Sequence, residues 1–195
     1  NLFISRNNRW LSPKFLIGES YGTTRVSGLA LALQNQQWVY LNGVILVSPT
    51  GLGIDRNGPV SAGNKLPYFT AAAWYHNQLS DELQNLSLEK VLEKSESFTE
   101  KELIPGLLLG SALSKDKKKT LAKRYSEYSG LKTKEILDHN MNVPYNYFWK
   151  NLLRSEAFTI GRLDSRYRGI DKKVAGVRPD YNAELTSWLH AFTPA

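Results

Sequence analysis

The sequence predicts an α/β fold in which a parallel β-α-β unit precedes a long helical region. Residues 14–18 and 42–51 centre on short, continuously apolar runs, which are typical of strands that a sheet buries on both faces. Residues 23–36 lie between them and have the composition of a helix, and glycines mark the junctions. Strand, helix and strand in this order favour parallel pairing of the two strands.

A change in composition near residue 80 predicts two domains. Residues 1–79 mix apolar runs with glycine-rich turns, whereas residues 80–195 are charged, follow a helical period and show no clear strand. Apolar residues in the second part recur at spacings of three and four, as Leu121, Tyr125 and Tyr128 do, which predicts amphipathic helices. We expect these helices at residues 86–95, 99–113, 118–130, 133–141, 145–153 and 181–192.

Two local signals mark ends of the predicted helices. Thr99, with Glu102 three residues later, has the pattern of a capping box, so we expect a helix to begin there. Gly130 follows a helical run at the position where a left-handed C-cap residue would lie. The helix before Gly130 is therefore expected to end at that residue.

The composition is that of a globular chain and excludes several kinds of chemistry. No apolar run approaches the roughly 20 residues of a membrane span, so we expect no membrane partner. Cysteine is absent, which excludes disulfides, thiolate nucleophiles and cysteine-bound zinc. No histidine and carboxylate cluster has the spacing of metal ligands, so we expect neither a metal nor another cofactor. The chain opens without Met or a leader, which indicates a fragment of a longer protein.

The net charge of +7 is concentrated rather than spread over a face. The run from Lys115 to Arg124 holds six basic residues against one acid. No aromatic residue is interleaved with these cations for base stacking, so we expect a solvated helix start and no nucleic-acid partner.

The pentapeptide Gly18-Glu19-Ser20-Tyr21-Gly22 matches the G-x-S-x-G elbow and lies between the first predicted strand and the helix. Such a tight turn strains the backbone of Ser20, and side chains at positions 18 and 22 would clash with neighbouring chain. The helix start favours developing negative charge, and the amide of Tyr21 is placed to donate to an oxyanion. We therefore predict that Ser20 is a nucleophile; the alternative is a structural, glycine-rich turn.

A nucleophilic serine needs a base, normally a histidine that an acid orients, in the chain order serine, acid, histidine. The three histidines are His76, His139 and His190, and none follows an apolar strand with a glycine-rich approach. Asp164 and His190 have the right order, but no long apolar strand precedes Asp164. We expect Asp164 to pair with an arginine and His190 to line a helix interface. The acid and histidine of the triad are then expected beyond residue 195.

These motifs resemble the bacterial branch of the serine carboxypeptidase family, α/β-hydrolase peptidases that include cathepsin A. The resemblance is carried by GESYGTTR with its flanks SPKFLI, GLALALQ and NGVILVSP, and by LPYFTAAAWYH and FTIGRLDSRYRG. It implies a partial α/β-hydrolase, a parallel β-α-β core around the nucleophile elbow, with a large helical cap insertion. Where many eukaryotic members have a second glycine after Gly22, this chain has Thr23, Thr24 and Arg25, so substrate preference is not transferred.

The resemblance implies a peptidase that releases C-terminal amino acids through an acyl-enzyme on Ser20. It implies that the Tyr21 amide is one oxyanion donor and that Glu19 recognises the C-terminal carboxylate of a peptide substrate. Two close carboxyl groups share a proton, so such a site would work best in acid. The alternative for Glu19 is a side chain held in a hydrogen-bond network under the elbow. A periplasmic or secreted bacterial location fits the same family.

Other functions remain open on the residues alone. An esterase or an aminopeptidase could use the same fold and elbow. A non-catalytic binding module could dock an acidic partner through the Lys115–Arg124 run, and exposed sheet edges could support a homodimer. A set of aromatic residues is expected mostly in the core, with the alternative that some line an apolar subsite. This set is Trp74, Tyr75, Tyr145, Tyr147, Phe148 and Trp149.

Overall fold

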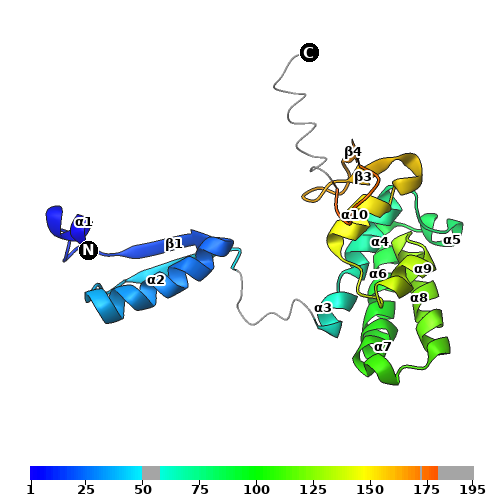
Figure 1. Cartoon of the computed structure of the whole chain (residues 1–195), viewed down its shortest axis with the longest axis horizontal. Coiled ribbons are helices and arrows are strands. Elements are labelled where there is room, and N and C mark those ends of the chain that lie inside the picture. The colour runs from blue at the N-terminus through cyan, green and yellow to red at the C-terminus, as the bar shows by residue number, and fades with distance from the viewer. Residues whose placement is uncertain (50–57, 172, 180–195) are drawn as a thin grey trace, which may run out of the picture. The chain divides into compact units, whose positions relative to one another are not determined.

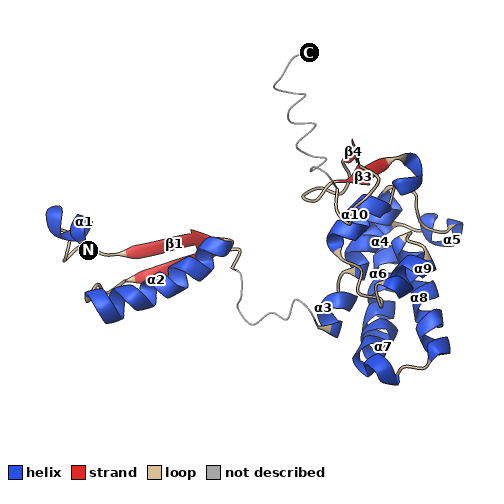
Figure 2. Cartoon of the chain, viewed as in Figure 1, coloured by secondary structure: helices blue, strands red, loops and turns tan. Residues whose placement is uncertain are grey.

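The structure is a computed structural model that describes residues 1–49, 58–171 and 173–179 (Figure 1). It is mixed α/β, with helices predominating and two small sheets, as Figure 2 shows. The chain divides into two compact units, Asn1–Ile54 and Asp55–Ala195. The boundary between the units therefore lies earlier in the chain than the boundary that the composition predicts, between residues 79 and 80. The reason is that the helices after residue 58 pack within the second unit.

The first unit is built around the predicted β-α-β arrangement. After α1 (Leu2–Arg6), it contains β1 (Phe15–Glu19), α2 (Tyr21–Gln37) and β2 (Gly43–Val47). The strands pair in parallel, with Ile17 opposite Ile45, and α2 packs against both of them (Figure 1). The predicted parallel pairing is therefore confirmed.

The second unit is helical, with a short hairpin near its end. Helix α4 packs against α6 and α8, and α8 packs against α9. The side chains of Ser87 and Ser114 cap α6 and α8 by accepting hydrogen bonds from backbone amides in their first turns. The helices are α3 (Pro59–Gly63), α4 (Leu66–Tyr75), α5 (Asp81–Gln84), α6 (Leu88–Phe98), α7 (Ile104–Leu109), α8 (Lys115–Ser129), α9 (Thr133–Asp138) and α10 (Tyr145–Asn151).

Two expectations about this unit are wrong and one is confirmed. Thr99 does not begin a helix, because α6 continues through a π-helical turn, Thr99–Leu103, directly into α7. Strands do occur after residue 80: β3 (Phe158–Ile160) and β4 (Arg168–Ile170) form an antiparallel hairpin, too short to show a period in the sequence. Gly130 is the left-handed C-cap of α8, as predicted, with φ 71°. The helix predicted at residues 181–192 lies outside the described residues.

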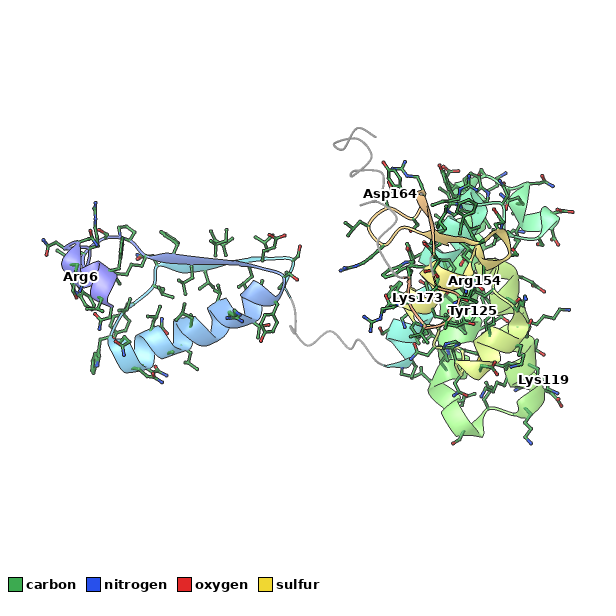
Figure 3. The ribbon with its side chains drawn as sticks, turned by 45° about the horizontal axis from the view of Figure 1, so that its top comes forward. Arg6, Lys119, Tyr125, Arg154, Asp164 and Lys173 are labelled. Atoms are coloured by element: carbon green, nitrogen blue, oxygen red, sulfur yellow. The ribbon has the colours of Figure 1, made fainter. Side chains whose placement is uncertain are left out.

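The core of the second unit forms around α4. Phe69 is fully buried and stacks on Phe148, with 3.9 Å between the ring centroids and 13° between the ring planes. The predicted amphipathic face of α8 is buried in the same cluster, which includes Leu121, Tyr125 and Tyr128. Tyr125 lies in the interior in Figure 3, whereas Lys119 of the same helix points outward.

Buried charge fixes the segment that follows the hairpin. The ammonium of Lys150 in α10 is buried in an ion pair with the carboxylate of Asp171 and donates to the Lys173 carbonyl at 2.8 Å. Arg154 reaches the same carboxylate at 3.2 Å and also donates to the Val174 carbonyl. These bonds attach Asp171, Lys173 and Val174 to the end of α10 and to the turn that follows it.

Candidate functional site

Ser20 occupies the turn between β1 and α2 in a conformation that few residues other than glycine adopt. Its φ and ψ angles are 52° and −121°. The Ser20 amide donates to the Val47 carbonyl at the end of β2, at 2.9 Å. The Ser20 carbonyl accepts from the amide of Thr23 at 3.0 Å and from its hydroxyl at 2.7 Å. Hydrogen bonds on both sides of Ser20 therefore hold the strained turn in place.

The two glycines of the elbow differ in what their positions tolerate. A Cβ at Gly18 would lie 2.4 Å from the Gly22 carbonyl oxygen and 2.8 Å from a methyl group of Val26. The predicted clash is confirmed there, because α2 crosses β1 too closely for a side chain. At Gly22 it is wrong: within the described part of the chain, a Cβ there would meet no atom within 4 Å.

The predicted oxyanion donor, the Tyr21 amide, lies beside Ser20, the predicted nucleophile. Tyr21 is the first residue of α2, so its amide is among those for which a helix supplies no internal acceptor. The aligned peptide dipoles of this 17-residue helix add positive potential at the same end. The side chain of Tyr21 is exposed and lies under the guanidinium of Arg25, 5.4 Å from the ring centroid. Backbone and dipole together favour a negative oxygen next to the Ser20 hydroxyl.

Glu19, the expected carboxylate-recognition residue, ends β1 and is exposed to solvent. Its register partner in β2 is Val47. Among the residues that the structure describes, none forms a hydrogen bond or ion pair with its carboxylate. The hydrogen-bond network considered as an alternative for Glu19 is therefore not formed within residues 1–49, 58–171 and 173–179.

The first unit contains no histidine. His76 follows α4, and its Nε2 lies 2.6 Å from the Ser165 carbonyl oxygen. His139 follows α9, and its Nδ1 lies 2.8 Å from the Glu135 carbonyl oxygen. Both rings are thus engaged by main chain of the second unit, while His190 lies outside the described residues.

Asp164 pairs with an arginine, as the sequence led us to expect. It lies in the loop of the β3–β4 hairpin (Figure 3), where Arg166 donates to both of its oxygens, Nε to Oδ1 at 2.9 Å and Nη2 to Oδ2 at 2.6 Å. These hydrogen bonds lower the pKa of Asp164 to about 2. The carboxylate serves the conformation of the hairpin.

The aromatic set divides between the two roles considered for it. Phe148 is core, whereas Tyr145 and Trp149 line a cavity of about 860 Å³. Trp74 and Tyr75 line a smaller cavity of about 280 Å³ beside the hairpin. Three cations of the larger cavity, Lys65, Arg162 and Arg178, were not identified from the sequence, because they are far apart in the chain and belong to no motif.

The basic run forms the first turns of α8, with Lys115, Lys117 and Lys119 exposed. Arg124 at its end pairs with Glu102 and lies 4.3 Å from the centre of the Phe98 ring. The described residues hold no group of three or more His, Cys, Asp or Glu side chains that could bind a metal ion. They also hold no helix that is long and apolar enough to cross a membrane.

Comparison of the chain with family models, with curated proteins and with solved structures found no match in any of the three. Assignment of the chain to a family therefore depends on the quoted motifs and on the geometry around Ser20.

Proposed function

We propose that Ser20 is the acylating nucleophile of a serine carboxypeptidase-type hydrolase that releases C-terminal amino acids from peptides. The observation that carries this proposal is the strained backbone of Ser20, at φ 52° between a parallel strand and a helix start. A turn of this kind holds the hydroxyl above the carboxyl edge of a sheet, next to a helix N-terminus. A structural turn alone would not require a strained serine between two glycines.

The proposed reaction is acyl transfer. The Ser20 hydroxyl attacks the last peptide carbonyl and loses its proton to a base, while the Tyr21 amide stabilises the oxyanion. The base returns that proton to the leaving amino group, and water then releases the acyl-enzyme. The described histidines, His76 and His139, are bound to main chain of the second unit. We therefore assign the base and its orienting acid to chain outside the described residues.

Glu19 would bind the substrate's free carboxylate. Its side chain is exposed and belongs to the residue that precedes Ser20, so it would lie close to the bond that is cleaved. Two carboxylates at contact repel unless they share a proton, so activity should be highest in acid. In this proposal the first unit is part of an α/β-hydrolase core and the second unit is its helical cap, which would exclude water from the reaction.

Fluorophosphonate labelling with intact-mass detection tests the nucleophile. We would apply it to the full translation product that carries these residues and to the 195-residue chain alone. The expected result is one adduct on the full product, lost in Ser20→Ala and retained in Ser27→Ala, a matched serine on the same helix. No adduct on the folded full product, or an adduct that survives Ser20→Ala, would overturn the proposal. Labelling of the 195-residue chain as well would place the base within this chain and make His190 its first candidate.

A further inference from the structure

The larger cavity of the second unit has the size and lining of a binding site. Its volume of about 860 Å³ lies within the range of roughly 300–1,000 Å³ that small-molecule pockets occupy. It is bounded by the start of α4, the start of α10, the β3–β4 hairpin and the segment that follows the hairpin. None of these elements belongs to the unit that holds Ser20.

Charge on the described wall of the cavity has one sign. Among the residues that the structure describes, the charged lining residues are Lys65, Arg162 and Arg178, and no carboxylate lines the cavity. Within the described parts of the chain, none of the three forms an ion pair. Neighbouring cations behave differently, since Lys150 and Arg166 are each paired with an aspartate. Positive charge is thus concentrated at this cavity, whereas the cations beside it are neutralised by aspartates.

Lys65 is held in the wall of this space. Its ammonium donates to the Asn142 side chain at 2.8 Å and lies 5.5 Å from the centre of the Tyr145 ring. Partial burial lowers the pKa of Lys65 from its ordinary value. A bound anion would stabilise the charged ammonium that this desolvation opposes.

The two aromatic lining residues, Tyr145 and Trp149, are held in place by contacts within the protein. Tyr145 and Trp149 stack with 5.9 Å between their ring centroids and 24° between their planes. The Trp149 indole donates to the Tyr68 hydroxyl at 2.8 Å, and that hydroxyl lies 2.6 Å from the Ser165 hydroxyl in the hairpin loop. The same loop carries Arg162, so these hydrogen bonds connect the aromatic rings to the loop that holds one of the cations. Such preorganisation lowers the entropic cost of binding.

We propose that this cavity binds a small organic anion that carries an aromatic ring. The oxyanion is held by Lys65, Arg162 and Arg178, and the ring packs against Tyr145 and Trp149. Guanidinium groups suit carboxylate and phosphate oxygens because they donate two parallel hydrogen bonds. Binding does not depend on Ser20 and persists in Ser20→Ala, so this proposal and the peptidase proposal fail separately.

The test is calorimetric titration of the 195-residue chain with three probes. N-acetyl-phenylalanine carries the ring and the charge, its amide carries only the ring, and acetate carries only the charge. The free acid should bind at least about tenfold more tightly than either of the others, since a hydrogen bond to a charged group contributes about 1.5–3 kcal/mol. Inorganic phosphate and phenyl phosphate, as a second pair, distinguish a phosphate ligand from a carboxylate one.

Variants localise the site. Arg162→Gln and Arg178→Gln should each lower the affinity for the free acid about tenfold, because each variant loses one hydrogen bond to a charged group. Lys134→Gln, an exposed cation outside the cavity lining, removes the same charge and should leave affinity unchanged. The indole resonance of Trp149, assigned by its loss in Trp149→Phe, should shift on binding. Equal binding of the acid and its amide, equal effects of all three charge variants, or no binding at millimolar concentration would each overturn the proposal.

Discussion

The two units reach their local geometry in different ways. The second unit is built around a contiguous cluster of buried side chains that includes Phe69, Tyr125 and Phe148. No described residue of the first unit belongs to that cluster, and its strand β1 leaves Phe15 and Ile17 61% and 69% exposed. The strained turn at Ser20 is nevertheless well defined. A strained turn can therefore be fixed by close backbone approach and a few hydrogen bonds, without a core of its own.

The apolar side chains of the first sheet are exposed because one face of the sheet is uncovered. Parallel strands in α/β proteins are normally covered on both faces. Here α2 covers the face of Gly18, so the alternation of a strand places Phe15, Ile17 and Ile45 on the opposite face, which no described element of the unit covers. A sheet of two strands has little stability of its own, so this one depends on α2, the helix that packs against it. We expect the first unit to be the less stable of the two.

Amide hydrogen exchange should show the largest difference between the units. Amides of α4, α6 and α8 should exchange only through global opening, because their helices form the buried cluster. Amides of β1 and β2 should exchange about 1,000-fold faster or more, given a total stability of several kcal/mol. Mass spectrometry of the whole chain would measure this. Equal protection of β1 and α4 would contradict the comparison and indicate that the first sheet is covered.

A matched pair of phenylalanine substitutions measures the same contrast energetically. Phe69→Ala should destabilise the second unit by about 3–5 kcal/mol, because it empties a fully buried site and removes the stacking on Phe148. Phe15→Ala should change stability by only about 0.5 kcal/mol, since the ring is largely exposed. Urea denaturation monitored by circular dichroism gives both values. Similar losses for the two variants would mean that Phe15 is buried in solution.

A pair of glycine substitutions sharpens the account of the elbow. Gly18→Ala should destabilise the turn by about 1–3 kcal/mol, because the new methyl group overlaps the backbone of Gly22. Gly22→Ala should be tolerated, since the described chain leaves space there. The exchange rate of the Thr23 amide, which donates to the Ser20 carbonyl, reports on the turn. Faster exchange in both variants would show that chain outside the described residues packs against Gly22.

The smallest effect concerns the pH response of the hairpin. The pKa of Asp164, lowered to about 2 by Arg166, lies below its ordinary value of 3.8. Its contribution to stability is therefore fully present above that ordinary value and is lost as the pH falls through about 2. NMR titration of the Asp164 carboxyl carbon should find this pKa, and Arg166→Gln should raise it toward the ordinary value. An unchanged titration in that variant would exclude Arg166 as the cause.

Local patterns predicted the parts of the fold that local contacts determine. The β-α-β unit and the elbow were visible because each strand is a continuous apolar run and because Gly18 and Gly22 flank Ser20. The β3–β4 hairpin was not, since strands of three residues show no period. The capping-box pattern at Thr99 did not mark a helix start. Thr99 is buried inside a helix that continues from α6, so packing rather than the local pattern decides its conformation. The cations of the cavity come from distant segments, and only tertiary structure brings them together.

C-terminal trimming is the measurement that tests the central claim about Ser20 most directly. The full translation product would be incubated, at acid and neutral pH, with a peptide bearing a free C-terminal carboxylate and with the same peptide amidated. The account predicts stepwise release of C-terminal residues from the free acid, faster in acid, none from the amide, and loss of activity in Ser20→Ala but not in Ser27→Ala. Trimming that persists in Ser20→Ala, or that starts from the amino end, would contradict it.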